Sequence, residues 1–389
     1  MISSITTSTE SATSTDTTSS TEPVTSTETT GSTEPVTSTE TTSTVTVETT
    51  TRTVAPYSDN PLLPQQWYFI KNDTFYNTHN INADAHIHPW PTQTYTGKGI
   101  KVVVIDDALD TTHEDLQGAV VETYDLETRT TNVRPKDNSE THGTAVTGLI
   151  GASSNSIGIS GIAPGVELYF IRLPFNSTIS DSVIVEAFQK AKEWGADVVN
   201  CSWGTGSVSD AVKSAIIDLA RNGRNGKGTI IVFASGNGGI DEIGDPIGND
   251  ESGIDEVIAV SATNINNERT AYSNYGPQLD LVAPGGEHMG LATLDLMGYA
   301  GVDMENYIEY DSSEAFGGTS AATPIVTGVV ALLLEANSSL TRDEVIQILE
   351  NNADKIDPTQ CTYDSNGHSD YCGYGKVNVE RTIRALIGG

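Results

Sequence analysis

Five short apolar runs recur along the chain, and each contains several β-branched residues. They occupy positions 100–105, 166–172, 197–202, 229–234 and 257–262. Helices cover both faces of a parallel sheet, so its strands read as continuous apolar runs instead of alternating apolar and polar positions. The five runs therefore predict buried parallel strands.

Helical patterns lie between and after these runs. Apolar positions spaced three or four residues apart predict helices over 181–194, 210–222, 342–351 and 377–387. Thr341 and Glu344 form a capping box at the start of the third helix. The alternation predicts an α/β fold of three layers, with a mostly parallel central sheet and helices on both faces. A functional site is then expected at the carboxyl ends of the strands.

The first 56 residues have a different composition from the rest. They are almost entirely Ser, Thr, Glu, Pro and Val, and the string STEPVTSTETT occurs at 20–30 and again at 32–42. A segment with so few large apolar side chains cannot bury enough surface to fold. We expect residues 1–56 to be a disordered tail or stalk and residues 57–389 to be the folded domain.

The chain is strongly acidic. It has 52 Asp and Glu against 20 Lys and Arg, which gives a formal net charge of −32. This balance argues against nucleic acid as a partner, because its phosphates would be repelled. It fits calcium binding, a salty or extracellular setting, or cationic substrates, and does not choose among them.

A candidate nucleophile follows a glycine-rich approach. The sequence Phe-Gly-Gly-Thr-Ser at 316–320 leads into an apolar segment that continues to Ala336. The segment predicts a buried helix with Ser320 in its first turn, where unpaired backbone N–H groups and the positive helix end favour developing negative charge. Taken alone, the pattern fits a tight turn before a core helix equally well.

Two upstream segments supply the partners that a serine nucleophile requires. The apolar run at 100–105 ends abruptly in Asp106, and His142 stands at the head of another apolar segment, followed by Gly-Thr. In this arrangement Ser320 attacks a carbonyl carbon and His142 takes and returns the proton. Asp106 fixes the imidazole tautomer and stabilises its cation.

These motifs together resemble the subtilisin-type serine proteases, with features of the kexin/furin branch. Four of them occur in that family's order and rough spacing: Val-Ile-Asp-Asp at 104–107, His-Gly-Thr at 142–144, Ala-Ser-Gly-Asn at 234–237 and Gly-Thr-Ser-Ala-Ala-Thr-Pro at 318–324. Pro-Gln-Gln-Trp-Tyr at 64–68 is typical of kexin-like catalytic domains near their start. The chain order Asp, His, Ser is that of subtilisin. The resemblance covers residues 57–389 and implies a subtilisin-like fold and a serine endopeptidase.

The resemblance also assigns groups around the triad. The amide of Asn237, at the end of a predicted strand, would donate to the tetrahedral oxyanion together with the Ser320 backbone N–H. Gly-Asn-Gly-Gly at 236–239 is also ordinary turn chemistry. Ser202, Trp203 and Gly204 match the family segment whose main-chain groups pair with an extended substrate.

A calcium site is a further implication of the resemblance. The loop 153–160 resembles the family loop that wraps the ion with an asparagine side chain and main-chain carbonyls, and mixed oxygen ligands of this kind suit Ca²⁺. A glycine-containing surface turn is the alternative. The implied ligands are Asp115, the Asn155 side chain, the carbonyls of Ile157 and Ile159, and either Asp59 or Asn60.

Three cysteines bear on the location of the protein. Cys361 and Cys372 flank a polar loop, and a disulfide closing that loop fits better than a metal site, whereas Cys201 belongs to a predicted buried strand. A disulfide favours an oxidising compartment. No apolar signal segment follows Met1, and we expect no stretch long enough to span a membrane. We expect a secreted or cell-surface protein whose sequence begins after a removed signal; an intracellular protein is the alternative.

Proteins or peptides are the expected substrates. Members of the resembled family commonly carry a folded pro-domain, for which the segment 1–56 has no room. Three alternatives stay open: such a domain lies outside this sequence, a separate pro-domain or inhibitor is a partner, or the protein does without one. A non-catalytic binding domain displayed on the stalk is the rival interpretation, although no catalytic position is lost.

The expected specificity departs from that of kexin-like enzymes. Those that require basic residues follow Ser-Trp-Gly with proline and a run of acids, and such a run is missing after Gly204. The floor of the primary pocket is expected near Gly248 or Asn249, and an arginine buried there without a partner would be costly. We predict a broad, mainly apolar or aromatic preference. Processing after basic residues is the alternative, which would need one of three nearby acids to turn inward: Asp245, Asp250 or Glu251.

Overall fold

The computed structural model of the chain describes residues 60–91, 94–175, 179–238, 244–298, 300–303, 305–312 and 315–388. The predicted tail over 1–56 and one of the two N-terminal calcium candidates, Asp59, lie outside the described residues, so both stay predictions.

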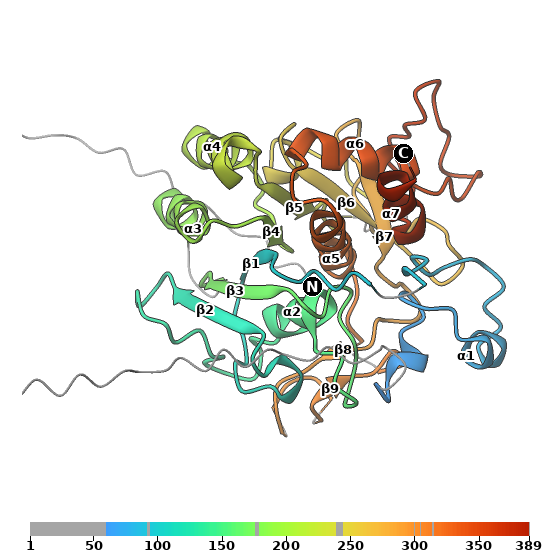
Figure 1. The fold of residues 1–389 in the computed structure, drawn as a ribbon, viewed down its shortest axis with the longest axis horizontal. Helices are drawn as coiled ribbons and strands as arrows, with labels where there is room; N and C mark the ends of the chain where they lie inside the picture. The colour runs from blue at the N-terminus through green and yellow to red at the C-terminus, as the bar shows by residue number, and fades with distance from the viewer. Residues whose placement is uncertain are drawn as a thin grey trace, which may run out of the picture. The chain divides into compact units, whose positions relative to one another are not determined.

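Strands and helices alternate through the described chain (Figure 1). The strands are β1 (Lys101–Asp106), β2 (Val120–Asp125), β3 (Glu167–Arg172), β4 (Val198–Cys201), β5 (Ile230–Ala234), β6 (Ile258–Thr263), β7 (Leu281–Pro284), β8 (Thr293–Leu294) and β9 (Tyr307–Ile308). The α-helices are α1 (Asp73–Thr78), α2 (His142–Gly151), α3 (Asp181–Trp194), α4 (Asp210–Gly226), α5 (Thr319–Ala336), α6 (Arg342–Asn352) and α7 (Val379–Ile387). Short 3₁₀ turns are η2 (Leu63–Gln65), η3 (Glu114–Leu116) and η4 (Glu251–Gly253).

Seven strands form one parallel sheet in the order β2-β3-β1-β4-β5-β6-β7. The five predicted strands correspond to β1, β3, β4, β5 and β6, which confirms the predicted parallel sheet. Strand β2 escaped prediction because it lies at the edge of the sheet and leaves several side chains exposed or half-buried. A second sheet pairs β8 and β9 antiparallel.

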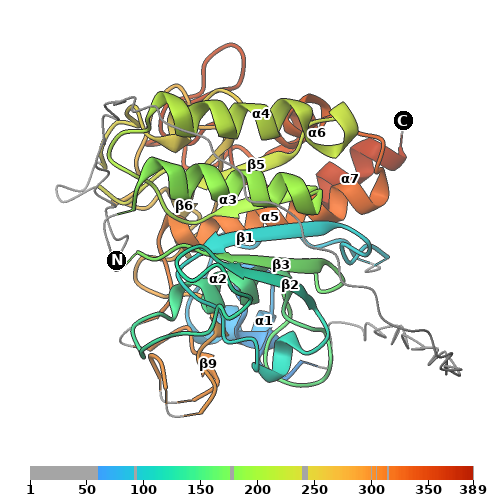
Figure 2. The same cartoon turned by 90° about the vertical axis from the view of Figure 1, so that its left-hand side faces the viewer.

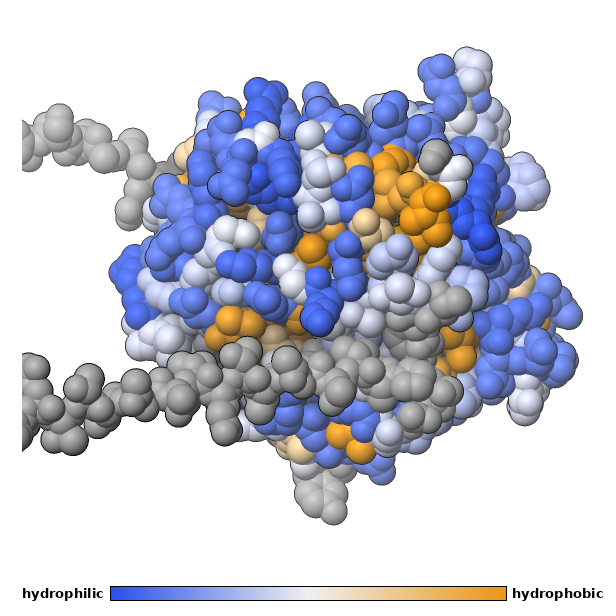
Figure 3. Space-filling view, in the orientation of Figure 1, coloured by the Kyte–Doolittle hydropathy of each residue, from blue (hydrophilic) through white to orange (hydrophobic). Residues whose placement is uncertain are grey.

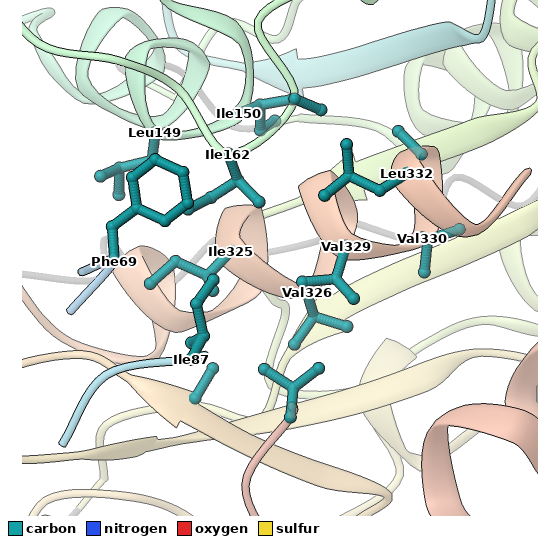
Figure 4. Close-up of a cluster of buried hydrophobic side chains, with 14 of the residues drawn as sticks. Phe69, Ile87, Leu149, Ile150, Ile162, Ile325, Val326, Val329, Val330 and Leu332 are labelled. Atoms are coloured by element: carbon teal, nitrogen blue, oxygen red, sulfur yellow. The ribbon is translucent and has the colours of Figure 1, made fainter. Parts of the chain in front are cut away.

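The two faces of the sheet are buried by different helices. Along β1, Val102 and Val104 point into one apolar cluster, whereas Val103 and Ile105 point into the other, as the two-residue period of a strand requires. Helices α2 and α5 cover the first face, and part of this cluster is drawn in Figure 4. Helices α3 and α4 lie side by side on the second face (Figure 2). Burial on both sides is the reason that the strands read as unbroken apolar runs.

Helix α5 is the central helix of the domain and packs against β4, β5, β6 and β7. Of the helices in the described ranges it alone is long and apolar enough to cross a membrane, with 18 residues and a mean hydropathy of 1.5. The prediction that no stretch reaches this length was therefore wrong. However, 89% of this helix is buried inside the domain, as expected for a core helix of a globular protein.

The C-terminal part also follows the predicted pattern. The capping box of α6 is present, with Thr341 accepting from the Glu344 backbone and Glu344 accepting from that of Thr341. Cys361 and Cys372 form the predicted disulfide, and Cys201 is a buried free thiol. The face seen in Figure 3 is mostly hydrophilic, consistent with the acidic composition.

Candidate active site

The predicted site residues lie at the carboxyl ends of three adjacent strands and at the starts of two helices. Asp106 is the last residue of β1, Ser202 follows β4 directly, and Asn237 lies three residues after β5. Strands β1, β4 and β5 are neighbours in the sheet. Helix α2 begins at His142, and Ser320 is the second residue of α5.

Asp106 and His142 form a direct hydrogen bond. Nδ1 of His142 lies 2.7 Å from Oδ1 of Asp106, whose side chain is fully buried, whereas the His142 side chain is 25% exposed. Burial opposes the charged imidazolium, but the Asp106 carboxylate outweighs this effect and raises the pKa of His142. The bond to Nδ1 leaves Nε2 as the nitrogen that is available for proton transfer.

Asp107 caps the helix that begins with His142, a role that the sequence analysis did not assign. Its carboxylate accepts from the backbone N–H groups of Gly143 at 2.7 Å and His142 at 3.3 Å. A Cβ added at Gly143 would lie 2.4 Å from the carbonyl oxygen of Ala108, so glycine lets α2 approach the end of β1 closely. Burial, and secondarily the Asp106 charge, raises the pKa of Asp107 to about 7. The only sequence signal for this capping role was a second acidic residue directly after Asp106.

Ser320 and Ser202 are joined by reciprocal hydrogen bonds. The Ser320 hydroxyl donates to the Ser202 carbonyl oxygen at 3.0 Å, and the Ser202 hydroxyl donates to the Ser320 carbonyl oxygen at 2.9 Å. That carbonyl needs an outside donor because Pro324, four residues on, has no N–H. Pro324 thus explains why the Ser202 hydroxyl is needed, and how α5 is fixed to the end of β4. In this rotamer Ser320 forms no hydrogen bond with His142 among the described residues, and apo sites often tighten only with substrate.

Thr319 holds the amide of Asn237 in one orientation. The backbone N–H and the hydroxyl of Thr319 both donate to Oδ1 of Asn237 at 2.9 Å. Because a backbone N–H can only donate, the amide oxygen faces Thr319 and Nδ2 points away from it. Gly318 has a φ of 92°, and a Cβ there would lie 2.8 Å from Nδ2. The Asn237 amide hydrogens therefore lie beside the approach to Ser320.

A buried arginine supports the loop that leads to His142, and sequence reasoning missed it. Arg172, the last residue of β3, is 2% exposed and pairs with the carboxylates of Glu140 at 2.5 Å and Asp125 at 3.5 Å. In the sheet it lies opposite Asp106. A charge at the end of an apolar run is the signal to look for, because a buried arginine must be paired.

The predicted substrate segment, Ser202 to Gly204, is held by hydrogen bonds from a residue within it and from the residue just after it. Trp203 is 2% exposed, and its indole N–H donates to the Ile105 carbonyl oxygen at 2.8 Å. Of the three nearby acids, Glu251 turns inward: it is 1% exposed and accepts from the Thr205 backbone N–H at 2.9 Å and from its hydroxyl at 2.8 Å. Gly204 thus lies between two anchored residues. A pocket of ≈ 410 Å³ lies beside the start of α5, with Gly317 and Gly318 in its wall.

The candidate calcium ligand Asp115 is fully buried. Its Oδ2 accepts from the Ile159 backbone N–H at 3.1 Å, whereas Oδ1 accepts no well-formed hydrogen bond among the described residues. Burial raises the pKa of Asp115 to about 7. A Cβ at Gly158, whose φ is 47°, would lie 2.3 Å from Oδ2, so only glycine leaves room for the carboxylate.

Asn60 gathers the carbonyl groups of the same loop. Its Nδ2 donates to the carbonyl oxygens of Ile157 and Ile159, each at 2.6 Å, and of Ser153 at 3.1 Å. Asn155 is exposed, and its Oδ1 accepts from the Ile157 backbone N–H at 3.1 Å. The structure therefore brings together Asp115, the two predicted carbonyls and Asn60, and the Asn155 side chain hydrogen-bonds the Asp115 carboxylate as well as shaping the turn.

Comparison with known proteins agrees with this geometry. The sequence model described as the subtilase family matches residues 97–375, which is most of the folded part. The chain belongs to the subtilase family. This subtilase is 32% identical over 363 residues to a calcium-dependent protease of Trichormus variabilis, covering 86% of this chain and 53% of that one. It is 32% identical over 307 residues to subtilisin E of Bacillus subtilis, covering 78% and 70% of the two chains.

A solved structure gives the same fold. The subtilase superposes on a protease from Pseudoalteromonas arctica with a TM-score of 0.68 and 25% identity, covering 85% of this chain and all of that one. The predicted subtilisin-like three-layer fold is therefore confirmed. The subtilase spans about half the length of the Trichormus protease that it matches.

Proposed function

We propose that this subtilase is a secreted, calcium-stabilised serine endopeptidase of broad, mainly apolar specificity. The observation that carries the proposal is the 2.7 Å hydrogen bond between Asp106 and His142, with Ser320 in the first turn of α5. Family membership supports the chemistry, and the Cys361–Cys372 disulfide supports an oxidising, extracellular location.

The proposed reaction begins when the Ser320 hydroxyl turns from the Ser202 carbonyl toward His142. Oγ attacks the substrate carbonyl carbon while Nε2 of His142 accepts the proton. The oxyanion receives hydrogen bonds from Asn237 Nδ2 and the Ser320 N–H. His142 then donates the proton to the leaving amine, the acyl–Ser320 ester forms, and water hydrolyses that ester by the same steps in reverse.

The apolar preference rests on the state of Glu251. Both of its oxygens accept hydrogen bonds from Thr205, and burial raises its pKa. Asp250 is likewise engaged, because its Oδ1 accepts from Ser252 and Gly253 as the cap of η4. These carboxylates stabilise the loops around the predicted primary specificity pocket. We therefore propose that neither pairs with a basic substrate residue.

A mixed peptide library tests this specificity. We expect cleavage after a range of apolar and aromatic residues, with Ser320→Ala giving no cleavage as the control for contaminating proteases. Cleavage confined to sites after Arg or Lys would contradict the preference. If Glu251→Gln then abolished that basic selectivity, Glu251 would be identified as the acid that reads the substrate.

We also propose that Ca²⁺ is held by Asp115, the carbonyls of Ile157 and Ile159, and the Asn60 amide oxygen after the amide rotates. Oδ1 of Asp115, which accepts no well-formed hydrogen bond within the described residues, and the convergent carbonyls fit a hard cation with oxygen ligands. The ion would supply positive charge to a buried carboxylate and tie the N-terminal segment to this loop. The name of the Trichormus relative, a calcium-dependent protease, supports this assignment.

Removal of calcium is expected to lower the melting temperature of the Ser320→Ala protein, which cannot digest itself. An ion that binds only the folded state stabilises it by about 3 kcal/mol at 100 times its Kd, which corresponds to roughly 5 °C for a domain of this size. Calorimetry with and without chelator measures the shift. Asp115→Asn should abolish the fall in melting temperature on chelation. Asp343→Asn removes one negative charge as well, but from an exposed side chain, and should retain it. An equal response in both variants would place the ion elsewhere.

A further inference from the structure

Asp84, His86 and His88 form a compact cluster away from the catalytic residues. Ile87 between the two histidines is fully buried, and its side chain points into the apolar cluster shown in Figure 4. The side chains of His86, His88 and Asp84 lie together on one side of this segment. The rings of the two histidines lie 4.3 Å apart, centroid to centroid.

The donor atoms of the three side chains are placed as the ligands of one small cation are. Nδ1 of His86 lies 3.1 Å from Oδ1 of Asp84, and Nε2 of His88 lies 2.9 Å from Oδ2 of Asp84. One ligand atom from each residue lies within 4.8 Å of the others. Tetrahedral zinc ligands with bonds of 2.0–2.1 Å lie about 3.3 Å apart. The cluster therefore needs only small side-chain movements to surround a metal ion.

His86 supplies an independent sign of a missing ligand. The residue is 8% exposed, and within the described part of the chain its Nδ1 forms no well-formed hydrogen bond, although Asp84 is near. A buried polar atom normally has a partner. The neighbouring His88 has a φ of 52°, a backbone conformation that costs energy for a residue other than glycine. This conformation directs its imidazole toward the same carboxylate.

The surroundings favour a metal with nitrogen ligands over calcium. The Asp354 carboxylate lies 3.7 Å from Nε2 of His88 and is oriented by hydrogen bonds from Asn378 at 2.8 Å and Arg381 at 2.7 Å. The ammonium group of Lys376 donates to the Asp84 carbonyl oxygen. Imidazole nitrogens therefore outnumber the carboxylate oxygens among the three ligands, and a donor set of this kind suits a transition metal better than calcium.

We propose that Asp84, His86 and His88 form a binding site for a divalent transition metal, zinc by its donor set, with Asp354 beside it. The site shares no residue with the proposed calcium site. The Asp84 side chain is 57% exposed, which gives the ion access from solvent.

The position of the cluster defines what the metal does. The Val379 N–H donates to the Ile87 carbonyl oxygen and the Glu380 N–H donates to that of His88, so α7 begins directly against this segment. Asp354 lies just after α6. Zinc held by these three residues would fix the conformation of the segment against which α7 packs, so its effect falls on stability and not on the chemical step.

The test uses full-length Ser320→Ala protein with saturating Ca²⁺, so that protease activity and calcium binding do not enter the result. Zn²⁺ is titrated by calorimetry, and Co²⁺ is added in parallel to record its visible absorption with nitrogen ligands. We expect one Zn²⁺ per chain and a melting temperature raised by roughly 5 °C at 100 times the Kd.

Matched variants locate the ion. His88→Asn removes the imidazole but keeps a residue that tolerates positive φ, and it should weaken zinc binding by more than about 100-fold. His368→Asn changes a half-buried histidine that lies 4.0 Å from Asp370, and it should bind as before. Absence of zinc binding would overturn the proposal, as would unchanged binding in both His88→Asn and Asp84→Asn. The Co²⁺ spectrum of the unaltered cluster decides the question if these variants fail to fold.

Discussion

Ser320→Ala is expected to lower kcat/KM for peptide hydrolysis by about 10⁶-fold, because loss of the nucleophile removes the acyl-enzyme route altogether. The fold should persist, since the substitution deletes one hydrogen bond, to the Ser202 carbonyl oxygen, worth about 1 kcal/mol. Steady-state hydrolysis of a fluorogenic peptide, with the melting temperature measured on the same sample, separates the two effects.

Ser214→Ala is the matched control for this change. Its hydroxyl lies on the exposed side of α4 and donates to the Asp210 carbonyl oxygen. Wild-type activity is expected. A Ser320→Ala protein that retained more than about a hundredth of wild-type activity would show that another group performs the attack, since triad losses are far larger.

Asp106→Asn is expected to lower kcat/KM by about 10⁴-fold at neutral pH, because an amide stabilises the wrong imidazole tautomer and cannot compensate the imidazolium charge. The pH profile supplies a second readout. Burial opposes the charged form of His142, but Asp106 raises its pKa, so wild-type activity should fall as pH drops through a value above about 6.5. In Asp106→Asn that acid limb should move to lower pH.

Asp107→Asn is the control that distinguishes the specific role of Asp106 beside His142 from a general loss of negative charge at the site. The amide oxygen can still accept from the Gly143 N–H, so the cap of α2 is retained and the expected loss stays within about 10-fold. The pKa of Asp107, raised to about 7 by burial, overlaps the same pH range, and the variant removes its contribution. Equal losses in Asp106→Asn and Asp107→Asn would contradict the assigned roles.

The central strands were predictable because burial on both faces of the sheet requires a continuous apolar run in the sequence. Strand β2 was not, because its exposed edge positions are polar, and β7 was not, because it is four residues long and ends in Pro284. The prediction that no stretch could span a membrane failed for α5 because a buried core helix and a membrane span share length and composition. Only packing distinguishes them.

The site divides in the same way. Residues at strand ends and helix starts, such as Asp106 and Ser320, carry local motifs and could be found from the sequence. The Arg172–Glu140 pair and the Asn60 contacts join segments 32 and more than 90 residues apart, so no local pattern contains them. The inward turn of Glu251 likewise depends on Thr205, which lies 46 residues earlier.

Covalent labelling tests the central claim, that Ser320 is the nucleophile of an assembled triad. A fluorophosphonate transfers its phosphonyl group to an activated serine oxygen and releases fluoride, and mass spectrometry of the digested protein locates the modified residue. The account predicts one label per chain, on Ser320, with labelling greatly slowed in His142→Ala and absent in Ser320→Ala. Labelling of a different residue, or equal labelling of wild type and Ser320→Ala, would contradict it.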